Sequence, residues 1–200
     1  MGYAFTVVAV IFGAFLGGLP TWFFSKKLQG NLLYRIKEAL KDRRHVCLNE
    51  EFLMTEMLAK KIQQDYYKPE VIFAICPGGA MISEWLSRRF LGSSHNVIPV
   101  RTLCIKCERS GGGVKSLKCF IKEDIDQVTK GLNKSSEVLL VNDISRGGRS
   151  LEVAHDFLCK FFPSEKVSSA TLFCHIDARI KPRFYAAETD KTVRFDWKES

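Results

Sequence analysis

Two apolar runs, each ending in a glycine turn, limit the folds open to this chain more than any other feature. VIFAIC at residues 71–76 leads into PGGA, and VLLVND at residues 138–143 leads into ISRGG. Apolar residues at helical spacing follow both turns, over 81–91 and 149–162. Short, uninterrupted apolar runs are typical of strands buried on both faces of a parallel sheet. The repeated order of strand, turn and helix predicts an α/β domain with a largely parallel sheet flanked by helices, whose ligand binds at the carboxyl ends of the strands.

Weaker patterns place the remaining elements. A helix is expected over 51–67, with Asn49 as its N-cap, because apolar residues recur there at helical spacing. Residues 104–122 are basic and glycine-rich without a clear period, so they are expected to form a mobile loop. Further strands are expected over 96–103, 168–176 and 192–197.

The N-terminal segment carries no charged residue from Tyr3 to Phe24. As a helix it would be about 33 Å long, which is enough to span a bilayer. A cleaved signal peptide and a buried core helix are the alternatives, although the segment has neither a basic n-region nor a small-residue cleavage site. Lys26 and Lys27 follow it and no basic side chain precedes it, so the positive-inside rule places the rest of the chain in the cytoplasm. We therefore predict a single-pass membrane anchor over residues 1–27.

Residues 28–47 form a basic segment after the predicted anchor. Within it, residues 31–44 place leucine and isoleucine on one helical face and basic side chains on the other, as in helices that lie on a membrane surface. A plain linker helix is the alternative. Gly13 and Gly17 form a GxxxG pair, a spacing that lets two membrane helices pack closely and so permits a homodimer. The chain is thus divided into residues 1–27, residues 28–47 and a folded domain over 48–200.

The charge and the cysteines of the chain limit the partners and metals that it is expected to bind. The formal net charge of +8 suits an anionic partner, but the chain carries no nucleic-acid-binding motif, so nucleic acid is not expected. The seven cysteines are scattered through apolar runs, which indicates reduced thiols in the cytosol. Cys104, Cys107 and Cys119 leave zinc binding as a minor alternative, because no second CxxC pair completes the set. No metal ligands on the protein are predicted.

The two glycine turns have the chemistry of phosphate-binding loops. Glycines let the chain approach a ligand closely, and the amides at the start of a helix attract anions. Gly78 and Gly79 provide such a turn after the first strand. After the second strand, residues 147–150 add an arginine and a serine, and Asp143 precedes them at the strand tip. Glycine turns also join strands to helices without binding anything, but the two together favour a phosphorylated sugar as ligand.

At these motifs the sequence resembles the type I phosphoribosyltransferases, particularly the purine and xanthine branch. VLLVNDISRGGRSL follows the frame of the family's signature strand and loop. KPEVIFAICPGGAMISEWL resembles its pyrophosphate-loop segment, and KPRFYAAETDKTVRFDW resembles its base-contacting tail. The resemblance implies a glycosyltransferase that moves the phosphoribosyl group from phosphoribosyl pyrophosphate to a nucleobase, with Mg²⁺ bound together with the pyrophosphate.

The resemblance also implies roles for individual residues. Asn142 and Asp143 would hold the ribose hydroxyls, and residues 104–120 would close over the site as a lid. The pyrophosphate would contact Gly78 and Gly79. His175 and Val193 would lie in the segments that contact the base or nucleotide. The 5-phosphate would lie on Gly147, Gly148, Arg149 and Ser150.

Several of these positions depart from the family pattern. Asn142 and Arg146 replace acids, Gly147 replaces a threonine, and His175 and Thr192 replace a lysine and an aromatic residue. An arginine at position 146 favours an anionic ligand and opposes a cationic, oxocarbenium-like transition state. Asp143 and Arg146 are therefore the catalytic candidates, although a turn arginine often points only into solvent and a lone histidine is often a packing residue.

Three classes of function remain open on these grounds. The first is a membrane-anchored phosphoribosyltransferase. The second is a catalytically degenerate module that senses a nucleotide or phosphoribosyl pyrophosphate at the membrane. The third is a membrane-surface scaffold without a saturable ligand.

Overall fold

The computed structural model describes residues 43–90, 97–110, 113–120 and 129–198. The predicted anchor over 1–27 lies outside these ranges, as do residues 28–42 of the predicted basic segment over 28–47. Within the described residues, the structure contains no helix that is both long and apolar enough to cross a membrane. The anchor therefore stays a prediction.

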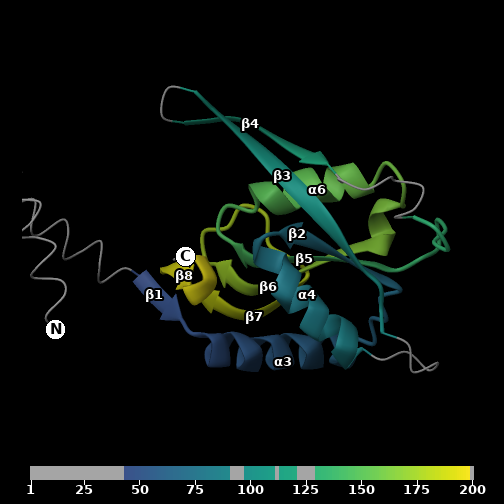
Figure 1. Cartoon of the computed structure of the whole chain (residues 1–200), viewed down its shortest axis with the longest axis horizontal. Coiled ribbons are helices and arrows are strands. Elements are labelled where there is room, and N and C mark those ends of the chain that lie inside the picture. Colours follow the sequence, from purple (N-terminus) through teal and green to yellow (C-terminus); the bar gives the residue numbers. More distant parts are fainter. Residues whose placement is uncertain (1–42, 91–96, 111–112, 121–128, 199–200) are drawn as a thin grey trace, which may run out of the picture. The chain divides into compact units, whose positions relative to one another are not determined.

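The core of the domain is a sheet of six strands in the order β4-β3-β2-β5-β6-β7 (Figure 1). All neighbouring pairs in it run parallel except β3 and β4, which pair antiparallel. The largely parallel α/β sheet predicted from the sequence is confirmed. Its strands are β2 (Val71–Cys76), β3 (Val100–Ser110), β4 (Gly113–Phe120), β5 (Val138–Ser145), β6 (Val167–His175) and β7 (Phe184–Thr189).

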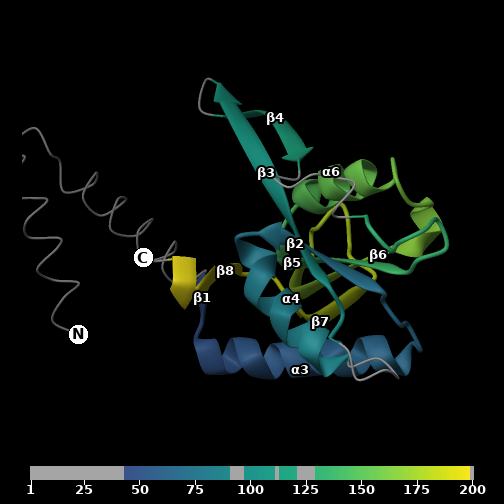
Figure 2. The same cartoon turned by 45° about the vertical axis from the view of Figure 1, so that its right-hand side comes forward.

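Helices cover both faces of this sheet (Figure 2). On one face lie α3 (Leu48–Gln64) and α4 (Gly78–Arg89), and on the other lies α6 (Arg149–Leu158). Alternate residues of a strand point to opposite faces. Leu139 and Val141 accordingly pack with α3 and α4, whereas Val138 and Leu140 pack with α6. Burial on both sides is why the strands read as uninterrupted apolar runs.

A separate two-stranded sheet pairs β1 (Arg43–Val46) with β8 (Thr192–Phe195). The strand expected over 192–197 is present as β8, although it pairs with β1 and lies outside the main sheet. The fifth parallel strand is β7, which was not expected from the sequence. The helix expected over 31–44 also overlaps the start of β1. Two short 3₁₀ helices lie at Ser164–Lys166, before β6, and at Asp196–Lys198, after β8.

Three other boundaries differ from the expectations. The first helix begins at Leu48 with Cys47 as its N-cap, so Asn49 lies inside the helix. Helix α4 begins at Gly78, so the glycine turn is the first turn of that helix. Most of the loop expected over 104–122 is the β3–β4 hairpin, in which Cys104 pairs with Phe120 and Ser110 with Gly113.

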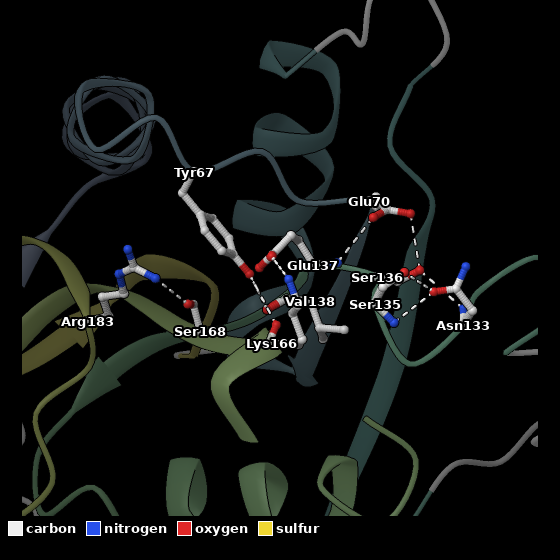
Figure 3. Close-up of polar contacts among 10 residues, drawn as sticks. All are labelled: Tyr67, Glu70, Asn133, Ser135, Ser136, Glu137, Val138, Lys166, Ser168 and Arg183. Carbon is white, nitrogen blue, oxygen red and sulfur yellow. Dashed lines mark hydrogen bonds and ion pairs between the residues drawn. The ribbon is translucent and has the colours of Figure 1, made fainter. Parts of the chain in front are cut away.

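Polar contacts close the amino-terminal end of the sheet (Figure 3). The buried Tyr67 donates a hydrogen bond from Oη to the carbonyl oxygen of Val138 at 2.7 Å. Nearby, Ser136 Oγ donates to Glu70 Oε2 at 3.1 Å, and Lys166 Nζ lies 2.5 Å from Glu137 Oε1. Because these groups bond to one another, this end of the sheet is tied together by protein contacts.

Replacing Tyr67 with phenylalanine is expected to lower the free energy of unfolding by about 1 kcal/mol at neutral pH, since the bond to Val138 is lost. The variant should also lose less stability in alkali. Burial raises the pKa of Tyr67 from its ordinary value of 10.0 to about 12. Between these values the unfolded chain releases this proton while the folded chain keeps it, so stability falls by about 1.4 kcal/mol per pH unit.

Urea unfolding at pH 7 and pH 11 measures both effects. The neighbouring Tyr66 is 88% exposed, so Tyr66→Phe is the matched control and should behave like the parent chain. An alkaline decline of equal size in Tyr67→Phe and the parent chain would contradict the prediction.

Candidate functional site

The two glycine turns predicted to bind phosphate meet at the carboxyl edge of the sheet. They follow β2 and β5, which are neighbouring parallel strands. A Cβ atom added to Gly78 would lie 2.5–2.7 Å from the carboxylate atoms of Asp143, so the backbone of Gly78 rests directly against that side chain. The structure thus brings together the first turn and the acid of the second strand, which are separated by more than sixty residues in the chain.

The start of helix α4 is packed tightly against strand β5. A Cβ atom added to Gly79 would lie 2.3 Å from the carbonyl oxygen of Val141, closer than real Cβ contacts allow. Both glycines are buried in the first turn of the helix, and Pro77, which follows a cis peptide bond, is the N-cap. Glycine is required here because the helix and the strand backbone leave no room for a side chain.

Asp143 lies two residues before the carboxyl end of β5 and faces the amino end of α4. Its side chain is 3% exposed, and Oδ1 accepts a hydrogen bond from the amide of Ile144 at 2.7 Å. The amino end of a helix favours a negative charge, so a carboxylate is suitably placed beside α4. The adjacent Asn142 is half-buried and donates from Nδ2 to the carbonyl oxygen of Ile144 at 3.1 Å. Asp143 therefore places a carboxylate at the edge where the turns meet.

Residues 146–150 form the turn between β5 and α6. Arg146 and Gly147 are exposed, and Gly148 is buried in the left-handed region with a φ of 81°. Gly148 is the N-cap of α6, and its carbonyl oxygen accepts the amide of Glu152 at 2.9 Å. No side chain caps this helix, so its first amides can receive an anion. Arg149 is exposed beside them.

His175 and Val193 lie in packed surroundings. At the end of β6, His175 Nε2 donates to the carbonyl oxygen of Asp190 at 3.1 Å, and Nδ1 accepts the amide of Asp177 at 3.2 Å. Val193 on β8 is 8% exposed and belongs to the core on the α3 side. Contacts of these two residues with a base stay predictions.

The β3–β4 hairpin continues past the end of β2, because Cys76 at the end of β2 pairs with Cys104 and β3 runs on to Ser110. It therefore projects from the edge that carries the glycine turns (Figure 1). Its predicted role as a lid over 104–120 stays a prediction. Burial raises the pKa of the Cys119 thiol to about 11, which disfavours the thiolate that zinc needs. The side chain of Cys107 lies outside the described part of the structure.

One residue of this region was missed from the sequence. Ser145 is 1% exposed and donates from Oγ to the carbonyl oxygen of Ile180 at 2.8 Å. The available signal was a hydroxyl at the end of a largely apolar strand, since a buried hydroxyl needs a partner.

Residues 48–200 match the family model of the phosphoribosyl transferase domain, and the chain therefore belongs to this family. The resemblance to phosphoribosyltransferases and the expected fold of the domain are confirmed. No curated protein sequence matches the chain.

Solved structures with the same fold include three of similar size. The purine phosphoribosyltransferase from Pyrococcus horikoshii Ot3 is 24% identical, with a TM-score of 0.62 over 78% of this chain and 94% of that chain. A hypothetical protein from Neisseria gonorrhoeae with bound ppGpp is 22% identical, with a TM-score of 0.61 over 78% and 89%. The xanthine-guanine-hypoxanthine phosphoribosyltransferase from Helicobacter pylori is 20% identical, with a TM-score of 0.62 over 78% and 93%. At these identities the likeness shows the fold alone.

Proposed function

We propose that the domain binds phosphoribosyl pyrophosphate at the carboxyl edge of the sheet and transfers its phosphoribosyl group to a nucleobase. The contact between Gly78 and Asp143 carries this proposal. In this contact the amino end of α4, which would bind the pyrophosphate, lies beside the carboxylate of Asp143, which would bind the ribose. The uncapped start of α6 would bind the 5-phosphate. The ligand's two anionic ends and its sugar then each have a matching group.

Each residue acts by binding and orienting the ligand. Asp143 accepts hydrogen bonds from the ribose hydroxyls, with Asn142 beside it. Gly78 and Gly79 contact the pyrophosphate. Gly147, Gly148, Arg149 and Ser150 surround the 5-phosphate. These contacts hold the anomeric carbon in place for attack by a base.

Magnesium fits this site as a cation that arrives with the ligand. The residues that the structure describes contain no cluster of three or more histidine, cysteine, aspartate or glutamate side chains able to hold a metal. Mg²⁺ commonly keeps its waters and binds through substrate phosphates with few protein carboxylates. When bound, it would neutralise charge on the pyrophosphate leaving group, and Asp143 is the nearest carboxylate to the Gly78 turn.

Arg146 favours a second candidate function, a binding module without turnover. Its side chain is exposed in the turn and forms no salt bridge with the other described residues. A cation there attracts phosphates but repels a developing positive charge on the sugar. The Neisseria protein of this fold holds ppGpp, which supports a nucleotide as an alternative ligand.

The N-terminal sequence supports a proposal on location. The uncharged stretch from Tyr3 to Phe24, followed by Lys26 and Lys27, favours a single-pass anchor with the domain in the cytoplasm, and Gly13 and Gly17 favour a homodimer. After alkaline carbonate extraction the chain should stay with the membranes. Its release into the supernatant would contradict the anchor.

Calorimetric titration of the full chain with phosphoribosyl pyrophosphate and MgCl₂ tests the function. Saturable binding is expected, and Asp143→Asn should weaken it about ten- to a hundredfold because a charged hydrogen bond acceptor is lost. Asp156→Asn is the matched control, since Asp156 is exposed on α6. Its affinity should equal that of the parent chain.

Release of pyrophosphate with a panel of nucleobases then separates the two candidates. Base-dependent release supports the transferase. Saturable binding without release supports the sensor. Absence of binding at millimolar ligand would exclude both and leave the membrane-surface scaffold.

A further inference from the structure

The turn proposed to bind the 5-phosphate rests against the loop of residues 176–183, which joins β6 to β7. A Cβ atom added to Gly148 would lie 2.4 Å from Cβ of Ile180 and 2.6 Å from its carbonyl oxygen. That same carbonyl oxygen accepts the hydrogen bond from Ser145 Oγ at 2.8 Å. Ile180 is therefore held between the tip of β5 and the N-cap of α6.

Other contacts also tie this loop to its surroundings. Arg179 lies 3.6 Å from Glu152 on α6, and Lys181 lies 3.3 Å from Glu188 on β7. These pairs are exposed, and exposed ion pairs contribute little because water and salt screen them. The bond from Ser145 is different, since its donor is 1% exposed. A buried hydroxyl that loses its acceptor is costly, so this bond sets the position of Ile180 more firmly than the exposed pairs.

The position of Ile180 bears directly on the turn. Gly148 is in the left-handed region, where a glycine has no side chain to hold its backbone angles. The packing of Ile180 against it supplies that constraint from outside. Anion binding by amides at a helix start depends on their converging on one point, which requires a fixed N-cap.

We propose that Ser145 is a positioning residue for the phosphate-binding turn. Its hydroxyl holds the carbonyl group of Ile180 against Gly148, and this contact fixes the amides at the start of α6. Ser145 acts through Ile180 and does not touch the ligand. The proposal rests on the proposed function, in which the turn of residues 146–150 binds the 5-phosphate.

Titrations of the full chain with ribose 5-phosphate and, separately, with pyrophosphate test this role. Ser145→Ala should weaken ribose 5-phosphate about tenfold and change pyrophosphate by less than about twofold. Ser145→Thr keeps a hydroxyl and should restore ribose 5-phosphate to within about twofold of the parent chain. Ser145→Cys keeps the volume with a weaker donor and should lie between the two.

A second buried serine provides the matched control. Ser87 on α4 is 3% exposed and donates from Oγ to the carbonyl oxygen of Ile98. Ser87→Ala loses a bond of the same kind, so it should lower the melting temperature without weakening ribose 5-phosphate.

The outcomes separate the proposal from the function beneath it. If the parent chain does not bind ribose 5-phosphate, the proposed function fails. If the parent chain binds and Ser145→Ala binds equally well, or weakens both ligands equally, Ser145 has no positioning role. If Ser145→Ala does not fold, the comparison of Ser145→Cys with Ser145→Thr decides, and equal affinities for ribose 5-phosphate contradict the proposal.

Discussion

Alanine in place of Gly79 is expected to lower the free energy of unfolding of the domain by about 3 kcal/mol or more, as overpacking of a rigid core does. The new Cβ atom would lie 2.3 Å from the carbonyl oxygen of Val141 and 3.0 Å from its carbonyl carbon. Both are backbone atoms of a central strand, so they cannot turn aside as a flexible side chain would. Relief requires α4 to move away from β5, which would open the core around the buried Ile82 and Leu86.

Urea unfolding of Gly79→Ala and Gly147→Ala provides the measurement and its control. A Cβ atom at Gly147 would meet nothing within 4 Å, so that variant should unfold within about 0.5 kcal/mol of the parent chain, as open surface sites do. Equal stability of the two variants would mean that α4 and β5 are not in close contact. The contact between Gly78 and Asp143 would then be contradicted as well, because the same turn of α4 makes both contacts.

The parallel sheet could be predicted because its central strands are buried on both faces. VIFAIC and VLLV are apolar at every position for that reason. Strand β7 lacks this signal. Only one of its faces is well covered, because Phe184 and Ala186 are buried whereas Tyr185 and Ala187 on the other face are half-buried, and alanine is weakly apolar. An edge strand of this kind resembles a loop in sequence.

The β3–β4 hairpin was missed for a related reason. Beyond Cys104, β3 no longer pairs with β2. In that part of the hairpin the two strands are held together by backbone pairing between β3 and β4. Backbone pairing does not require alternating apolar residues, so the sequence of a basic, glycine-rich hairpin resembles that of a loop.

The candidate site was predictable where it follows from strand direction. Parallel strands bring their carboxyl ends to one edge, so the two turns had to be neighbours if β2 and β5 are adjacent. The bond between Ser145 and Ile180 joins residues 35 positions apart, and no local pattern marks Ile180 as its partner. The contacts of His175 with Asp177 and Asp190 likewise depend on how the chain returns after β6.

Aspartate in place of Arg146 is expected to weaken binding of phosphoribosyl pyrophosphate about tenfold and to raise the rate of base-dependent pyrophosphate release. Arg146 is exposed, so its interactions are screened nearly as in water. At a separation of about 5 Å and an effective dielectric constant near 80, each unit charge contributes about 0.8 kcal/mol, and the substitution changes two. The resulting 1–2 kcal/mol, roughly a tenfold effect, acts against an anionic ligand and in favour of a cationic transition state.

Titration and release assays at low ionic strength separate these two effects. Arg88→Asp is the control for net charge, because Arg88 is an exposed residue in the last turn of α4 and undergoes the same charge change. Faster release in Arg146→Asp alone would mean that the arginine limits transfer and that the parent chain is better suited to holding its ligand than to converting it. A loss of release in Arg146→Asp would instead mean that the transferase uses the arginine, with an acceptor or leaving group whose negative charge it neutralises. In either case, a change of charge at this one position in the turn would decide whether the domain converts its ligand or only binds it.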